Sequence, residues 1–226
     1  VCLWADDKMG AVSFTIDDGI AWEHDWWIET MARYGWKATW FVIVAYVQYG
    51  RSPGEFGSWE DFRRLYSLGH DVESHTYTHG HCNDPEYSWT DGGCPPPYQC
   101  CDIDTEYAKA QRIIRDSIPG NPCWAIAYSG HKVTDRIYID PNGDTIYYDS
   151  YAHDYDIAAK YYIIGRGTIG RPSIVNKVNY LNTYAGSITK EWIDNIIDYN
   201  PSESHYWRGW IANLVHNVAR SRTDTS

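Results

Sequence analysis

Two adjacent carboxylates stand where a short apolar run ends, in Thr15-Ile16-Asp17-Asp18-Gly19. Along a strand, neighbouring side chains point to opposite faces of the sheet. A turn that begins at Gly19 would instead let Asp17 and Asp18 reach one pocket. The alternative is an Asx turn, in which an aspartate side chain bonds to the nearby backbone and does no chemistry.

Two histidines follow a second short apolar run, in the segment Ser74–His79. Because His75 and His79 are four residues apart, we expect them on one face of a helical turn, close enough to share a metal ion. The alternative is a pair of surface histidines. His70 and His81 flank the pair, but their spacing suits the same site less well.

A third element, Leu214-Val215-His216, comes at the end of the last expected strand, where a lone histidine could equally be packed or face solvent. The three elements end different strands, so in a barrel-like sheet they would converge on one face. Two histidines and one carboxylate form a three-ligand metal site with an open position, as in hydrolytic zinc enzymes. The remaining carboxylate and histidine would supply a base and an acid.

Expected strands and helices alternate along the chain. The strands are 11–16, 38–44, 70–73, 124–128, 161–164 and 210–215, and the helices are 26–34, 58–68, 106–117 and 189–199. Gly35 closes the first helix, and Ser58 is the expected N-cap of the second, with Asp61 at N3. This alternation predicts an α/β fold with parallel strands and chemistry at their C-terminal ends. Without repeats or a linker, we expect a single domain over residues 1–226.

The charge balance restricts the partners. Nineteen basic and thirty acidic residues give a net charge of −11, which argues against nucleic acid and disfavours a strongly anionic substrate. No stretch of 18 apolar residues is present, so we expect no membrane span. The chain lacks an initiating Met and a signal peptide, and we interpret it as a mature or trimmed form. We expect a monomer.

The cysteines indicate the compartment. They are even in number, four of them fall within twenty positions, and no C-x-x-C pair suggests structural zinc. We expect disulfides across a long loop, with free thiols as the alternative, and therefore a secreted or periplasmic protein. The six are Cys2, Cys82, Cys94, Cys100, Cys101 and Cys123.

The motifs resemble those of the polysaccharide deacetylases, the NodB-homology group or carbohydrate esterase family 4. Thr15–Gly19 is similar to their T-F-D-D-G motif, Ser74–His79 contains a segment similar to H-S/T-x-x-x-H, and Leu214–His216 looks like their late L-x-H. Their order and separation agree over nearly the whole chain. The resemblance implies a distorted (β/α) barrel of about seven strands. Since only ten residues follow His216, we expect a barrel that is incomplete at its C-terminal end.

The resemblance also implies a reaction and its residues. It would be metal-dependent removal of acetyl groups from a carbohydrate polymer or oligomer: chitin- or peptidoglycan-type N-deacetylation, or O-deacetylation of xylan. The ion would be Zn²⁺, with Co²⁺ or Ni²⁺ as alternatives. Asp17 would be the base that activates metal-bound water, and His216, resting against Leu214, the acid for the leaving group. The metal ligands would be Asp18, His75 and His79.

One family motif is altered. The frequent R-P-P-Y-G is replaced by the stretch 126–131, which is closer to an A-Y-P-Y-G variant and has no Arg. The Gly130 amide is a candidate oxyanion donor. Arg166, at the end of the following strand, could replace the missing guanidinium or be an ordinary surface charge. The altered motif and short C-terminus motivate an alternative function, a non-catalytic glycan-binding domain that retains the metal pocket.

Aromatic residues suggest a sugar ligand. Twelve Trp and twenty Tyr are far above ordinary usage, and such rings stack on sugars while their polar edges meet hydroxyls. We expect most of them to serve packing. Candidates for sugar contact are Trp22, Trp89, Tyr98 and Tyr128, with Tyr155 a weaker one.

The segment 165–170 matches G-x-G-x-x-G after an expected strand. A dinucleotide site would need a helix next and an acidic strand end about 20 residues later. Pro172 and the helical pattern over 189–199 supply neither, so we reject this interpretation.

Overall fold

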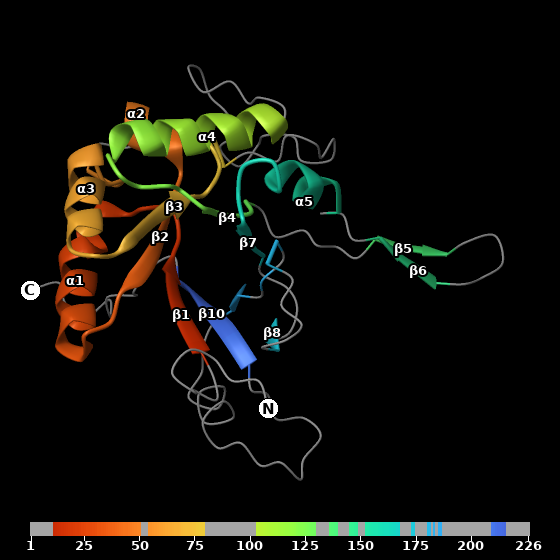
Figure 1. Ribbon diagram of the computed structural model, residues 1–226, viewed down its shortest axis with the longest axis horizontal. Helices are drawn as coiled ribbons and strands as arrows, with labels where there is room; N and C mark the ends of the chain where they lie inside the picture. Colours follow the sequence, from red (N-terminus) through yellow and green to blue (C-terminus); the bar gives the residue numbers. More distant parts are fainter. Residues whose placement is uncertain are drawn as a thin grey trace, which may run out of the picture.

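A computed structural model describes residues 11–50, 54–79, 103–129, 136–139, 145–148, 152–167, 173–174, 180–181, 183, 185–186 and 209–215. Six parallel strands form the centre, in the spatial order β7-β4-β3-β2-β1-β10 (Figure 1). They are β1 (Ala11–Ile16), β2 (Ala38–Val42), β3 (Asp71–Ser74), β4 (Ala125–Ala127), β7 (Ile164–Arg166) and β10 (Gly209–Val215).

The two ends of this row approach each other through one short segment. Strand β9 (Ala185–Gly186) pairs in parallel with β10, and Thr183 forms a parallel bridge with Arg166 of β7. Strand β8 (Ser173–Ile174) is antiparallel to β10. Within the described residues the sheet is therefore curled, with six parallel strands in a row and the two-residue β9 as a seventh. The expected distorted and incomplete (β/α) barrel is confirmed.

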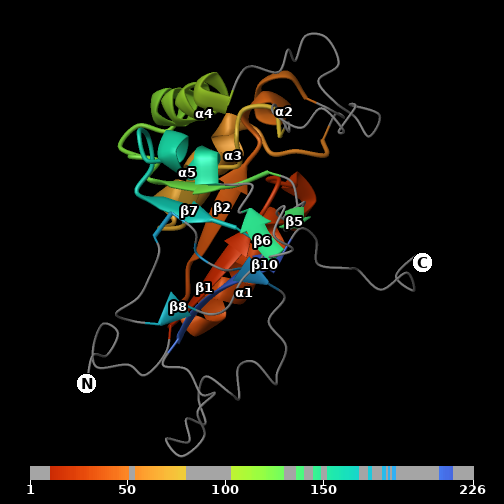
Figure 2. The ribbon, with the colours of Figure 1, turned by 90° about the vertical axis from the view of Figure 1, so that its right-hand side faces the viewer.

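Helices α1 (His24–Tyr34), α3 (Trp59–Ser67) and α4 (Ile103–Ser117) cover the outer face of the curled sheet (Figures 1 and 2). The shorter helices η2 (Ala21–Glu23), α2 (Val44–Tyr49) and α5 (Ala152–Ala158) follow β1, β2 and β6 along the chain. The predicted helix ends hold at two places. Gly35 closes α1 with φ 67°, and Ser58 forms a capping box with Asp61 at the start of α3.

The main core lies between the helices and the sheet. It joins buried strand residues such as Ile16, Trp40 and Val72 to helix residues such as Phe62 and Ile114. A second, small cluster consists of Phe41, Ala125 and Ala127, with Ile164 packed against it. Because Phe41 follows Trp40 in the same strand, it points to the opposite face, which is the inside of the barrel. On this face the alanines of β4 lie next to the Phe41 ring.

Several predicted elements are corrected. The second strand ends at Val42 rather than 44, because the chain turns into α2. The strand expected at 161–164 is β7, displaced to Ile164–Arg166. The insertion after β4 contains an antiparallel hairpin of β5 (Arg136–Ile139) and β6 (Thr145–Tyr148), which extends from the body in Figure 1, followed by α5. The helix expected at 189–199 lies outside the described residues.

The structure bears in part on two expectations from composition, which concern the cysteines and a membrane span. Cys123 is a buried free thiol, whereas the other five cysteines lie outside the described residues. In the part of the chain that is described, no helix has the length and apolar character required to cross a bilayer.

Candidate metal and catalytic site

The turn after β1 brings both aspartates to one place. Asp18 has φ 68° and Gly19 has φ 76°, so the chain turns through the left-handed region directly after Asp17. The Asp17 amide donates to the Val215 carbonyl of β10 at 2.9 Å, which extends the sheet by one residue. A Cβ at Gly19 would lie 2.8 Å from the Phe62 ring, so glycine is required there for space as well as conformation.

The loop after β3 carries the histidines, but not on a helical turn. Thr76 and His79 have φ 65° and 62°, values that a helix does not contain, so the expected helical turn is wrong. Side chains fold the loop instead: Ser74 Oγ accepts from the Thr76 amide at 3.1 Å, and Thr76 Oγ1 accepts from the His79 amide at 3.0 Å. Strained backbone of this kind is typical of functional sites.

Asp18, His75 and His79 form a candidate metal site. Asp18 Oδ1 lies 3.5 Å from His75 Nε2 and 3.8 Å from His79 Nε2, and the two imidazole nitrogens are 3.1 Å apart. All three atoms lie within 4.8 Å of one another. Asp18 Oδ1 is buried and has no hydrogen-bond partner among the described residues. Two nitrogens and one oxygen at this spacing, with an unsatisfied carboxylate oxygen between them, fit a divalent cation such as Zn²⁺.

His75 is oriented to act as a ligand. Its Nδ1 lies 3.0 Å from the Ala127 carbonyl of β4, so Nδ1 carries the proton and Nε2 presents its lone pair to the cluster. Burial lowers the pKa of His75 to about 4, although the Asp17 carboxylate opposes this shift. The imidazole is therefore neutral at neutral pH, which is the form that binds metals.

Asp17 lies beside this cluster and is held by Arg166. Arg166 Nη2 donates to Asp17 Oδ2 at 2.5 Å, and the two side chains are only 2% and 1% exposed. The guanidinium stacks over Phe41 inside the barrel, 5.1 Å from the ring centre. Asp17 Oδ2 is also 3.7 Å from His75 Nε2. Of the two alternatives for Arg166, the surface charge is excluded by its burial.

Glu106 is a buried residue next to the site that the sequence patterns above do not identify. Its carboxylate, 1% exposed, enters from α4 and accepts from the amides of Tyr77 and Thr78 at 3.0 and 2.8 Å and from Thr78 Oγ1 at 2.9 Å. The sequence contains an indication that Glu106 is buried, since it lies four and eight residues before the buried Ala110 and Ile114 on the same face of α4. A charged residue in the apolar stripe of a helix calls for a specific partner.

The other candidates divide into three groups. Trp22 is 47% exposed on η2, close in sequence to the aspartates, and Leu214 is half-buried in β10 in register with Thr15. His70 is structural, since its Nδ1 accepts from the Ala38 amide at 3.1 Å. Four candidates lie outside the described residues: Trp89, Tyr98, Gly130 and His216.

Tyr128, a predicted sugar contact, is buried instead. It is 4% exposed, its hydroxyl donates to the Leu181 carbonyl at 2.8 Å, and its ring packs against Tyr107 and Tyr155. The ring therefore serves packing. Gly165, from the rejected glycine motif, lies against this hydroxyl so closely that a Cβ would overlap it. The glycine is explained by close approach rather than by a dinucleotide.

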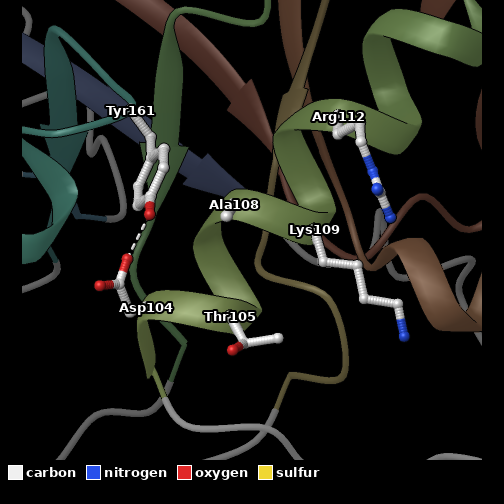
Figure 3. Close-up of a pocket in the computed structure, with 6 residues that line it drawn as sticks. All are labelled: Asp104, Thr105, Ala108, Lys109, Arg112 and Tyr161. Atoms are coloured by element: carbon white, nitrogen blue, oxygen red, sulfur yellow. Dashed lines mark hydrogen bonds between the residues drawn. The ribbon is translucent and has the colours of Figure 1, made fainter.

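A groove of about 410 Å³ lies on α4 and shares no residue with the Asp-His cluster (Figure 3). Tyr161 and Asp104, which are hydrogen-bonded to each other, stand on one side of it, and Lys109 and Arg112 stand on the other. Lys160 Nζ forms an ion pair with Asp104 at 2.6 Å. None of these residues belongs to the predicted site.

Comparisons with known proteins agree with the motifs. A family model described as polysaccharide deacetylase matches residues 5–139. A gellan lyase from a Bacillus species is 31% identical over 245 residues, which cover 98% of this chain but only 8% of that protein. The chain therefore spans a small part of the curated relative that it matches.

Solved structures share the fold. A de-N-acetylase from Aggregatibacter actinomycetemcomitans superposes with a TM-score of 0.56 at 14% identity, over 82% of this chain and 74% of that one. A deacetylase from Streptococcus pyogenes, solved in complex with acetate, gives 0.52 at 18% identity, over 76% of this chain and 62% of that one. At these identities the likeness concerns the fold.

Proposed function

Since the chain belongs to the polysaccharide deacetylase family, we propose that it hydrolyses acetyl groups from an acetylated glycan with the help of a divalent cation. The observation that carries this proposal is the convergence of Asp18, His75 and His79 on one point, with the buried Asp17 carboxylate beside them. The most suitable ion for two imidazoles and one carboxylate is Zn²⁺, with Co²⁺ or Ni²⁺ as substitutes.

The ion would contribute Lewis acidity, which polarises the acetyl carbonyl and makes water more acidic. Asp18, His75 and His79 would hold it. Asp17 is the proposed general base: Arg166 favours its ionised form and fixes the carboxylate through one oxygen. The distance of 3.7 Å between Asp17 Oδ2 and His75 Nε2 supports this role, because a base must lie close to the ion whose water it would activate.

Two further proposed roles concern residues beyond the described part of the chain. His216 follows β10 directly, and β10 is the neighbour of β1 that receives the Asp17 amide bond. We propose that His216 protonates the leaving sugar nitrogen or oxygen and that the Gly130 amide supports the oxyanion. Trp22 is the proposed sugar contact from the described residues.

The substrate class is an acetylated polysaccharide, with either an amide or an ester bond. The net charge of −11 favours a glycan of low negative charge. The match to a gellan lyase adds gellan to the glycans worth testing. Cys123 is a free thiol, so the proposal that the protein acts outside the cytoplasm rests on the four cysteines clustered within residues 82–101.

Acetate release tests the proposal. The purified chain, loaded with Zn²⁺, is incubated with acetylated chitin oligomers, peptidoglycan fragments, acetylated xylan and acetylated gellan, and free acetate is measured. We expect release from at least one of them, its loss after chelation, and its loss in Asp17→Asn with zinc content unchanged. Glycan binding without acetate release by the wild-type chain would favour the non-catalytic alternative, and release by Asp17→Asn at the parent rate would refute Asp17 as the base.

A further inference from the structure

The loop that carries both histidines has an unfavourable backbone. Thr76 and His79 both have positive φ, and Thr76 is β-branched, so the left-handed conformation is especially costly there. A loop of this kind keeps one conformation only when the surrounding structure holds it. The position of both imidazoles relative to Asp18 depends on that support.

The carbonyl groups of the loop are held by α2. The amides of Val44 and Ala45, in the first turn of α2, donate to the carbonyls of Thr76 and Tyr77 at 3.4 and 2.8 Å. The His75 amide donates to the Val42 carbonyl at 2.9 Å, which continues the pairing of β3 with β2. One side of the loop is thereby attached to the strand and helix that precede it in the chain.

The amide groups of the loop are held by Glu106. One carboxylate oxygen accepts from both the Tyr77 and Thr78 amides, and the other accepts from the Thr78 hydroxyl. These contacts link residues 28 and 29 positions apart, so they attach the loop to α4 and not to its own neighbours. Lys109, one turn further along α4, lies with Nζ 3.6 Å from the centre of the Tyr77 ring.

We propose that Glu106 is a positioning residue for the metal site. By fixing the backbone between His75 and His79, it holds the two imidazoles at the separation at which they share one cation with Asp18. This inference rests on the proposed function, because it presumes that the Asp18-His75-His79 cluster binds a metal. It assigns a share of the metal affinity to a side chain that binds the backbone between the two histidines, as outer partners of metal ligands commonly have.

The test is zinc affinity, measured by competition with a chromophoric chelator on the purified full chain. Glu106→Gln keeps the side-chain volume but removes the negative charge and one of the two acceptors, so its bonds to the Tyr77 and Thr78 amides lose their charge assistance. We expect zinc affinity to fall about 10- to 100-fold. Asp104→Asn is the matched control, since it neutralises another α4 carboxylate that pairs with Lys160 and does not hold the loop. We expect its zinc affinity to equal that of the wild type.

A purely structural role is distinguished by urea unfolding in EDTA, where no metal contributes. Weakened zinc affinity in a Glu106→Gln chain that keeps a cooperative transition and wild-type circular dichroism supports positioning. Where Glu106→Gln does not fold, Thr78→Val and Thr78→Ser carry the test. The serine variant keeps the hydroxyl and should retain zinc affinity, and the valine variant should lose part of it.

Two negative results have different meanings. Equal zinc affinity in the wild type and Glu106→Gln, or in Thr78→Val and Thr78→Ser, would overturn the positioning role and leave the proposed function intact. A wild-type chain that binds no zinc, cobalt or nickel would overturn the metal site, and the positioning role with it.

Discussion

The ion pair inside the barrel gives a quantitative test. Arg166 and Asp17 are almost fully buried, and the nearest nitrogen and oxygen are 2.5 Å apart. At an effective dielectric constant of about 20, two unit charges at that separation attract by about 7 kcal/mol. Desolvation offsets much of this attraction, but removing one partner leaves an uncompensated buried charge and costs about 3–5 kcal/mol. Arg166→Met should therefore lower the free energy of unfolding by about that amount.

Urea unfolding in EDTA, on the wild type, Arg166→Met, Asp17→Asn and the double variant, measures the coupling. A domain of this kind has about 5–15 kcal/mol in total, so the single arginine variant should be markedly unstable but measurable at low temperature. In the double variant neither charge remains, and stability should partly recover. We expect a non-additive coupling on the order of 2 kcal/mol.

The pH dependence of activity provides a second measurement on the Arg166–Asp17 ion pair. Without the guanidinium, the Asp17 carboxylate binds a proton more readily, so the acidic limb of the kcat/KM profile should move to higher pH. Arg166→Lys keeps the charge and should move the limb less. Additive stabilities within about 0.5 kcal/mol, together with an unmoved acidic limb in Arg166→Met, would show that the pair does not govern Asp17.

Two further predictions concern packing and protonation. Gly165→Ala places a methyl group against the Tyr128 hydroxyl and the Leu181 carbonyl. Urea unfolding should therefore show a loss of about 1–3 kcal/mol in the free energy of unfolding. Part of this loss should disappear in a Tyr128→Phe background, which lacks the hydroxyl. Burial lowers the pKa of His24 from 6.5 to about 4. Its contribution to the free energy of unfolding is therefore fully present above pH 6.5, where the ring is neutral in both the folded and the unfolded chain. This contribution, up to about 3 kcal/mol, is lost as the pH falls toward 4, because the unfolded chain then binds the proton more readily. Urea midpoints in EDTA from pH 7 to pH 4 should therefore decline less steeply in His24→Phe than in the wild type; equal slopes would contradict the assignment.

The location of the site could be predicted from the sequence because the ends of the strands can be recognised in it. Asp17 and Asp18 follow an apolar run that is a strand over the predicted residues, and the histidines follow another. Parallel strands end at one edge, so residues far apart in sequence meet there without any knowledge of their contacts. The strand ends predict that the aspartate pair meets the two histidines, whereas the choice of Asp18 as the metal ligand came from the family resemblance.

The local backbone could not be predicted in the same way. The spacing of His75 and His79 fits a helical turn, and the structure achieves the same proximity with positive φ at Thr76 and His79. Spacing constrains which side chains can meet, but not the path of the chain between them. The path here is set by α2 and by Glu106, and both depend on tertiary contacts that no local pattern contains.

Burial decided the cases in which two interpretations were open. Arg166 could have been a surface charge, and Tyr128 could have faced a sugar. The structure buries both, one against Asp17 and the other against Leu181. Neither outcome follows from residue type, because arginine and tyrosine each have a long apolar part that can be covered and a polar end that needs a partner.

The position of Arg166 fits the proposal that it replaces the guanidinium missing from the altered motif. Ala127, in the stretch that replaces R-P-P-Y-G, is the register partner of Arg166 on the neighbouring strand β7. Ala125 and Ala127 are small, so the barrel interior next to them has room for a guanidinium over the Phe41 ring. A cation that reaches Asp17 from β7 therefore needs small residues on β4, and a large side chain at Ala127 would compete for its space. We therefore propose that Arg166 on β7 supplies the guanidinium that the altered motif lacks, and that the small Ala127 beside it leaves the space this requires.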